Sequence, residues 1–141
     1  MKGIYLLIIG LEKEMIKEVG SLGDVMFQRG NYIYIGSAQN SLEARVARHM
    51  SSQKKMHWHI DYFLEDAEIK EVLAFESGSE KECELAQRLN NKFTHVRDFG
   101  CSDCSCDSHL FFTEKDLGEL LDSIFEEIDV EPIKGSELEI Q

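Results

Sequence analysis

The stretch that decides the expected fold begins Tyr34-Ile35-Gly36-Ser37-Ala38-Gln39-Asn40 and continues through 41–49. Its first part is typical of a buried strand that turns sharply at Gly36, and its second part predicts a short helix. Asn40 is the expected N-cap, and Glu43 occupies the acidic position of a capping box. The helix has an apolar stripe at i, i+4 and i+8, formed by Leu42, Val46 and Met50. This stripe predicts a core-facing side and leaves the opposite side for polar chemistry.

The polar side of this helix carries Arg45, Arg48 and His49. Arg45 and His49 are four residues apart and therefore share a helical face, with Arg48 beside them. A guanidinium offers a planar fork of charged donors, and an imidazole accepts or donates a proton near neutral pH. The pair suits a phosphate group. On these three residues alone, a solvated basic helix face is the more ordinary interpretation.

Two tripeptides in a fixed order change this balance. Gly3-Ile4-Tyr5, then Tyr34-Ile35-Gly36, then R-x3-H on the next helix together resemble the GIY-YIG nuclease superfamily. Three later motifs, at 57–62, 82–86 and 100–110, are similar to a mostly archaeal branch grouped with Uri-type endonucleases: H-W-H-I-D-Y, E-C-E-L-A and G-C-S-D-C-S-C-D-S-H-L. The resemblance covers most of Gly3 to Phe112. It implies an α+β fold with a small, mainly antiparallel central sheet of three or more strands flanked by helices.

Composition predicts one globular domain. A chain of 141 residues buries an adequate core without staples, and its 43% hydrophobic and 30% charged residues are ordinary values. Residues 1–112 are the expected nuclease-like part, with a Cys/His loop at 99–109. Residues 113–141 are expected to form an acidic C-terminal helix and tail packed on the same domain. No apolar run is long enough for a membrane span, and 4–11 alternates like a strand rather than a signal peptide, so the expected location is cytoplasmic, without a membrane partner.

The net charge of −12 argues against extensive nucleic-acid contact, but its distribution is uneven. Residues 110–141 hold ten acids and two bases. Between Ser41 and Ile60 there are four bases, one acid and three histidines. The basic patch therefore coincides with the motif.

The order of the predicted elements follows from periodicity and turn residues. An antiparallel meander is expected first, with strands at 2–11, 15–19, 25–27 and 32–35 and a lengthened hairpin at 12–30. A helix is expected at about 57–65, with an extended H-x-H-x-D strand as the alternative. The remaining elements are a strand at 68–75, a helix at 80–89 capped by Ser79, a strand at 110–112, a helix at 113–127 capped by Thr113, and a frayed tail at 134–141.

The resemblance implies metal-assisted hydrolysis of a DNA phosphodiester bond. Glu84 is the expected ligand of Mg²⁺ or Mn²⁺, with Glu82 as the alternative. Arg45 would stabilise charge on the phosphoryl oxygens, and Tyr5 or Tyr34 would activate water, with His49 accepting or relaying the proton. The family's later asparagine has no equivalent. DNA, branched or damaged, would be bound by Arg48, Lys54, Lys55, His57 and His59.

The Cys/His loop predicts a second metal site. Cys101, Cys104, Cys106 and His109 combine thiolates with an imidazole, which is zinc-ligand chemistry, although a tight loop with buried thiols explains them equally well. His57, His59 and Asp61 would hold a metal on a strand, whereas on a helix the histidines would line a basic groove. Two other functions stay open: a non-catalytic nucleic-acid-binding module on the nuclease scaffold, and a zinc-binding interaction domain.

Overall fold

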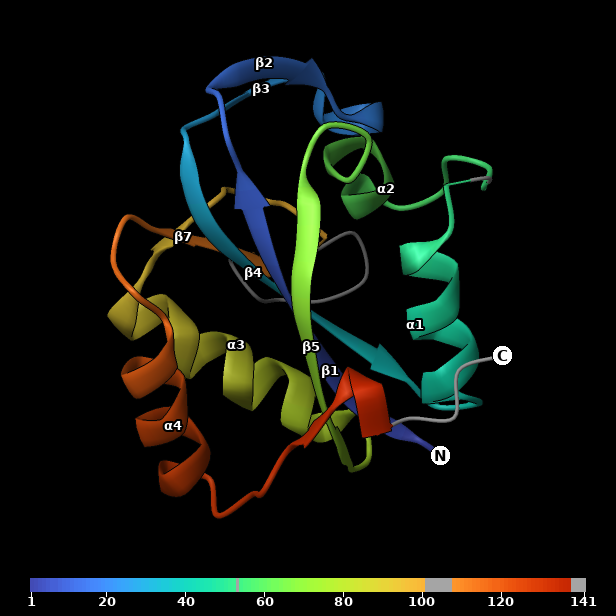
Figure 1. Ribbon diagram of the computed structural model, residues 1–141, viewed down its shortest axis with the longest axis vertical. Helices are drawn as coiled ribbons and strands as arrows, with labels where there is room; N and C mark the ends of the chain where they lie inside the picture. The colour runs from blue at the N-terminus through green and yellow to red at the C-terminus, as the bar shows by residue number, and fades with distance from the viewer. Residues whose placement is uncertain (53, 101–107, 138–141) are drawn as a thin grey trace.

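A computed structural model describes residues 1–52, 54–100 and 108–137. Their fold is α+β, as the sequence predicts, with a six-stranded antiparallel sheet in the order β6-β7-β4-β1-β5-β8 and helices on both of its faces (Figure 1). The strands of this sheet are β1 (Gly3–Leu11), β4 (Gly30–Ala38), β5 (Glu68–Glu76), β6 (Thr94–His95), β7 (Leu110–Thr113) and β8 (Ile133–Lys134).

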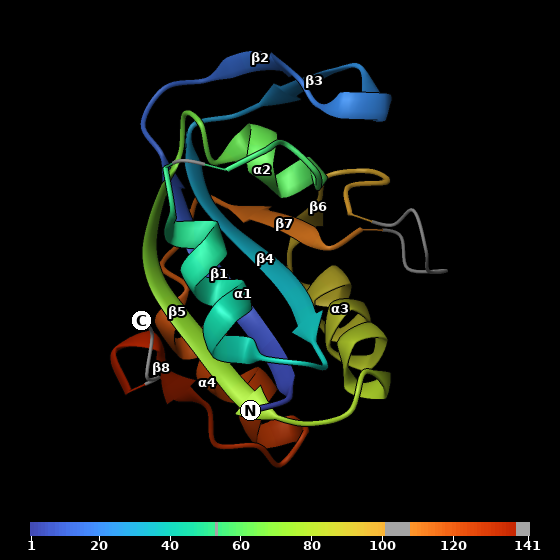
Figure 2. The ribbon, with the colours of Figure 1, turned by 90° about the vertical axis from the view of Figure 1, so that its right-hand side faces the viewer.

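The sheet is built around β1, which pairs with β4 on one side and β5 on the other. All nine residues of β1 are buried, because helices cover both faces of the sheet. Tyr5, Leu7 and Ile9 point to the face covered by α1 (Leu42–Met50) and α2 (His59–Phe63). Ile4, Leu6 and Ile8 point to the face covered by α3 (Glu80–Lys92) and α4 (Gly118–Glu127) (Figures 1 and 2). Because successive side chains of a strand point to opposite faces, β1 contributes to the core layers on both sides of the sheet.

The first hairpin is lengthened, but the predicted meander is wrong. The strand β1 pairs directly with β4, from Gly3 with Ala38 to Leu11 with Gly30. The residues between them form a separate two-stranded sheet of β2 (Met15–Glu18) and β3 (Asp24–Phe27), joined through the 3₁₀ turn Gly20–Leu22. The inserted hairpin therefore extends beyond the end of the main sheet and does not add strands to it (Figure 2).

The deciding stretch differs from its prediction at two positions. The chain does not turn at Gly36, because β4 continues to Ala38 while it pairs with the first residues of β1. The N-cap of α1 is Ser41 rather than Asn40, and its Oγ accepts a hydrogen bond from the Ala44 amide at 3.1 Å. The apolar stripe also ends early, since Met50 is exposed.

The later elements also depart from their predicted ends. The helix α2 is shorter than predicted and α3 longer, and Ser79 makes no side-chain cap hydrogen bond. Thr113 ends β7 instead of capping a helix, and α4 begins only at Gly118. The segment predicted to fray contributes β8, which pairs with Leu73 and Ala74 of β5, and the 3₁₀ turn Gly135–Glu137. Apolar Ile133 explains this pairing, since it packs against the core beside β5.

One edge of the sheet is left partly open. The strand β7 pairs with β4 from Asn31 to Tyr34, and the Ile35 amide donates to the His109 carbonyl at 2.9 Å. Among the described residues, no strand lies beyond residues 36–38 of β4. The helix α3 lies beside this uncovered part (Figure 2). Side chains from both faces of the sheet can meet at this edge. Within the described ranges, no helix has the length and apolar character needed to cross a bilayer.

Candidate active site

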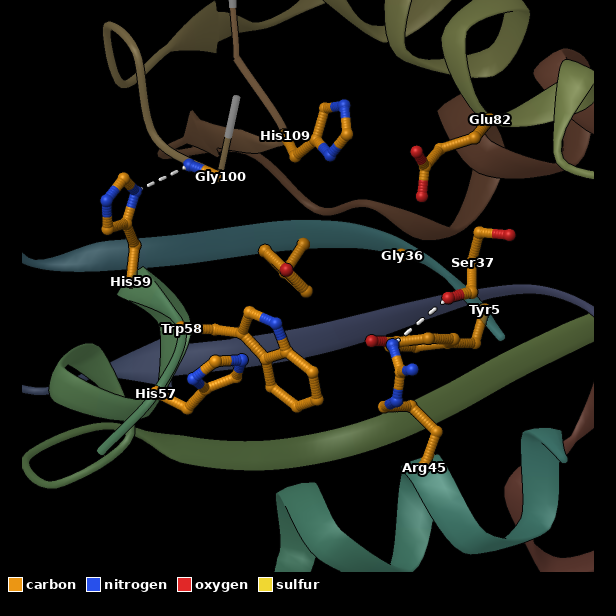
Figure 3. A pocket seen from close by; sticks show the side chains of 11 residues that line it. Tyr5, Gly36, Ser37, Arg45, His57, Trp58, His59, Glu82, Gly100 and His109 are labelled. Carbon is orange, nitrogen blue, oxygen red and sulfur yellow. Dashed lines mark hydrogen bonds between the residues drawn. The ribbon is translucent and has the colours of Figure 1, made fainter. Parts of the chain in front are cut away.

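A cavity of about 240 Å³ lies at this open edge, between α1, the start of α2 and α3 (Figure 3). Tyr5 of β1 and Tyr34 and Gly36 of β4 line it from the sheet. Figure 3 shows Glu82 and His109 on one side of the cavity, and Arg45 and the segment 57–59 on the other. Residues from six parts of the chain therefore converge on one concave site.

Gly36 makes room for the phenol of Tyr5. The two residues are partners across the β1–β4 ladder, and a Cβ atom at position 36 would clash with Cζ and Oη of Tyr5. Gly36, in the second tripeptide, therefore leaves the space that the ring of Tyr5, in the first tripeptide, occupies. The rings of Tyr5 and Tyr34 lie on the same face, with centroids 6.4 Å apart.

Tyr5 and His49 form a buried pair, with 2.6 Å between Tyr5 Oη and His49 Nε2. His49 is 2% exposed because it occupies position i+7 of the stripe begun by Leu42 and Val46. Burial lowers the His49 pKa to about 3, and the charges of Lys54, Arg48 and Arg45 add to this effect against the opposing charge of Asp61. The imidazole is therefore neutral at pH 7, and its Nδ1 has no hydrogen-bond partner among the described residues.

Both tyrosines keep their protons at neutral pH. Burial raises the pKa of Tyr5 above its ordinary value, although the charge of Arg45 opposes this rise. Burial likewise raises the pKa of Tyr34 well above its ordinary value. A neutral phenol bound to a neutral imidazole is the resting state of the pair.

Arg45 is held at the cavity by two contacts. Its Nη1 donates to the Ser37 carbonyl at 3.1 Å, and its Cζ lies 4.5 Å from the centroid of the Trp58 ring. Arg48 also stacks on Trp58, with its Cζ at 4.2 Å from the ring centroid. Such cation–π contacts limit the motion of both guanidinium groups.

Buried Asp61 anchors this stack. Its two carboxylate oxygens accept from Arg48 Nη1 at 3.0 Å and Nη2 at 2.9 Å. Oδ2 also accepts from the backbone amides of His57 and Trp58, at 2.9 Å each. Burial alone would raise the Asp61 pKa, but these donors outweigh it and lower the pKa. The carboxylate is thus committed to Arg48 and to the start of α2, and the H-x-H-x-D segment is not a metal-binding strand.

The acid at the cavity is Glu82 and not Glu84. Glu82 lines the cavity, and burial raises its pKa while the charge of Arg45 opposes the rise. Glu84 is exposed and forms ion pairs with Lys81 and Arg88 along α3, at 3.4 and 3.9 Å. Helical periodicity accounts for the difference. Position 82 shares a face with the buried residues at 85, 86 and 89, whereas position 84 lies on the opposite side.

Two more histidines, His59 and His109, also line the cavity. The His59 Nδ1 accepts a hydrogen bond from the Gly100 amide at 2.8 Å, and burial lowers the His59 pKa. His109 is buried, and burial lowers its pKa as well. His109 was predicted as a zinc ligand, but Cys101, Cys104 and Cys106 lie outside the described residues. Among those that are described, no three His, Cys, Asp or Glu side chains form a metal-binding cluster.

The residues predicted to bind DNA separate into two groups. His57 and His59 line the cavity. Arg48 is engaged by Asp61 and by the Lys55 carbonyl, and Lys54 donates to the His49 carbonyl at 2.7 Å. Lys55 is exposed and outside the cavity lining. Sequence reasoning missed Trp58 as a site residue, although its place between two histidines was a usable signal.

Comparison with known proteins finds a matching family model. A family model described as "Domain of unknown function DUF123" matches residues 4–130. No curated protein and no solved structure matches the chain. The matched range contains every residue discussed at the cavity.

Proposed function

We propose that this chain, which belongs to the family described as domain of unknown function DUF123, is a GIY-YIG-type nuclease that hydrolyses DNA phosphodiester bonds with a divalent metal ion. One observation carries the proposal. Tyr5, Tyr34, Arg45 and Glu82 line one cavity, and His49 is bonded to Tyr5 beneath it. These are the residue types that the superfamily resemblance implies, in the order in which the resemblance implies them.

Arg45 would bind the scissile phosphate and stabilise the charge that develops on its oxygens. The Ser37 carbonyl and the Trp58 ring hold the guanidinium in place before any ligand arrives. A preorganised donor loses little entropy when it binds, and it acts most strongly where water is excluded. Loss of one such donor typically lowers kcat by about 10²–10³.

Tyr5 is the better candidate for activating water, because its hydroxyl already has a proton acceptor. As the attacking water loses a proton to Tyr5 Oη, the phenol proton moves along the 2.6 Å hydrogen bond to His49 Nε2. In the free protein the proton stays on the phenol, since the Tyr5 pKa is raised and that of His49 is about 3. A phosphate anion in the cavity raises the His49 pKa and so favours the transfer.

Glu82 would hold the metal ion. Its carboxylate is half-buried near one guanidinium, and a divalent cation would offset the burial that raises its pKa. Mg²⁺ suits one carboxylate, because it keeps several waters and shares substrate oxygens rather than needing an all-protein cage. When bound, the ion polarises the phosphate and stabilises the leaving oxygen.

The test is nicking of supercoiled or branched DNA in the presence of Mg²⁺. We expect Arg45→Ala to lower the rate by about 100-fold or more, and EDTA to abolish it. Arg88→Ala is the matched control, because Arg88 ion-pairs with Glu127 at 3.0 Å and does not line the cavity. Equal rates for wild type and Arg45→Ala, or activity that persists in EDTA, would reject the mechanism. Binding of DNA without turnover would favour the non-catalytic alternative.

A further inference from the structure

We infer that the cavity accepts one unpaired nucleotide, so that the substrate is single-stranded or locally unpaired DNA rather than regular duplex. The inference rests on the proposed function, because it assigns the cleavage site to this cavity. Three properties of the described residues support it: the depth of the reacting groups, the uneven chemistry of the walls, and the shortage of cations around the opening.

The reacting groups lie at the bottom of the cavity. Tyr5 is 1% exposed and Tyr34 is 7% exposed, so a phosphate must enter the cavity to approach either hydroxyl. The space is about 240 Å³, which is below the roughly 300–1,000 Å³ of a site for a drug-sized ligand. A space of this size admits one nucleotide at most, and a base-paired helix cannot enter it. Nucleotides are extruded most easily where they are unpaired, because no stacking or pairing energy is lost.

The two ends of the cavity differ in charge. Arg45 and Glu82 lie at one end (Figure 3). The other end is formed by His57, His59 and His109, and Trp58 lies between the two ends, with Arg45 Cζ 4.5 Å from its ring centroid. Burial lowers the pKa of His59, which favours the neutral form of this ring. Neutral aromatic rings suit a base and its sugar, whereas a second phosphate would prefer charged donors. A nucleotide would therefore lie with its phosphate at Arg45 and its base at the histidine end.

Cations that could follow a duplex backbone are few near the opening. Arg45 is the one Lys or Arg side chain in the cavity lining, among the residues for which positions are described. Arg48 is committed to Asp61, and Lys54 to the His49 carbonyl. The whole chain carries a net charge of −12. Duplex binders that make 6–10 phosphate contacts depend strongly on salt. Recognition here must depend on insertion into the cavity, with about one or two phosphate contacts.

The experiment uses the emission of Trp58, which is the one tryptophan of the chain and lines the cavity. A thymidine hexanucleotide, a blunt 12-base-pair duplex and inorganic phosphate are titrated in EDTA, where cleavage does not occur. We expect the hexanucleotide to bind at least about tenfold more tightly than the duplex. With one or two phosphates neutralised, the slope of log K against log salt for this single strand should lie between about −0.7 and −1.4. Equal or tighter binding of the duplex, or competition by phosphate at the same concentration as the hexanucleotide, would overturn the inference.

His57→Ala probes the aromatic end without threatening the fold, because His57 is exposed. Loss of an aromatic contact to one base should weaken hexanucleotide binding by about fivefold or more. His95→Ala is the control, since His95 lies in β6 outside the cavity lining. If both substitutions weaken hexanucleotide binding equally, or if neither weakens it, the proposed base-binding end is contradicted. Preferential binding of the hexanucleotide without any cleavage would keep this inference and reject the nuclease. Cleavage by a protein that prefers duplex would do the reverse.

Discussion

His49 should make the protein lose stability as the pH falls below 6.5. Its pKa is about 3 in the folded protein, because burial and the charges of Lys54, Arg48 and Arg45 outweigh the charge of Asp61. In the unfolded chain the imidazole has its ordinary pKa of about 6.5. Between these two values the unfolded state binds a proton that the folded state does not. The stability contributed by neutral His49 is therefore complete above pH 6.5 and is lost progressively towards pH 3.

The size of this effect follows from the pKa difference. Each pH unit below the unfolded pKa costs about 1.4 kcal/mol, so the cost at pH 5 is about 2 kcal/mol. Solvent does not reduce this effect, because the His49 side chain is only 2% exposed. The assay is urea unfolding at pH 7.5 and pH 5 for wild type and His49→Gln. Glutamine keeps a side-chain hydrogen-bonding group near Tyr5 but binds no proton in this range.

The difference between the two proteins isolates His49. His59 and His109 also have lowered pKa values and destabilise both proteins at pH 5. We therefore expect wild type to lose about 2 kcal/mol more than His49→Gln between pH 7.5 and pH 5, with unchanged m-values. The same pH dependence in both proteins would refute the view that His49 is buried and neutral.

Three further outcomes are expected. Asp61→Asn removes the buried partner of Arg48 and should lower the free energy of unfolding by about 3 kcal/mol, or Tm by roughly 10 °C. The exposed Asp66→Asn is the control and should change stability by less than about 1 kcal/mol. Equal effects would mean that the buried Asp61–Arg48 pair stabilises the fold no more than an exposed pair does. Gly36→Ala should lower the free energy of unfolding by about 1–3 kcal/mol and abolish cleavage, because the added Cβ displaces Tyr5. Gly118→Ala in α4 should leave cleavage unchanged, because its added Cβ meets only Asp116 Oδ1, at 3.6 Å. Full activity of Gly36→Ala would show that Tyr5 does not take part in the reaction. Elemental analysis of protein purified without added metal should find near one equivalent of zinc, lost in His109→Ala, and its absence from wild type would remove the zinc site from 101–109.

The central strands and α1 were predictable because local patterns agree with tertiary packing there. The alternation in β1 and β4 follows from burial on one or both faces. The ends were less predictable, because they depend on pairing between distant residues. Gly36 looks like a turn residue in isolation, but its backbone pairs with Tyr5, and the missing side chain serves the Tyr5 ring. The C-terminal Ile133 pairs with β5, which is distant in the sequence.

The site residues were likewise only partly predictable from the sequence. Tyr5, Tyr34, Arg45 and His49 were found from motif order, and the structure brings them together. The choice of Glu84 overlooked helical phase, since Leu85, Ala86 and Leu89 already indicated that position 82 faces inward. The stack of Arg45, Trp58 and Arg48 on Asp61 was not predictable, because it joins two helices through side-chain contacts that leave no periodic pattern.

Separate replacement of two glutamates on α3 tests the central claim most directly. Glu82→Gln and Glu84→Gln make the same chemical change, two residues apart on α3, but only Glu82 lines the cavity. The measurement is the single-turnover rate of DNA cleavage at saturating Mg²⁺. We predict that Glu82→Gln lowers this rate by at least about 100-fold, while Glu84→Gln retains the wild-type rate. A Glu82→Gln variant as fast as wild type, or a Glu84→Gln variant as slow as Glu82→Gln, would contradict the assignment of catalysis to this cavity.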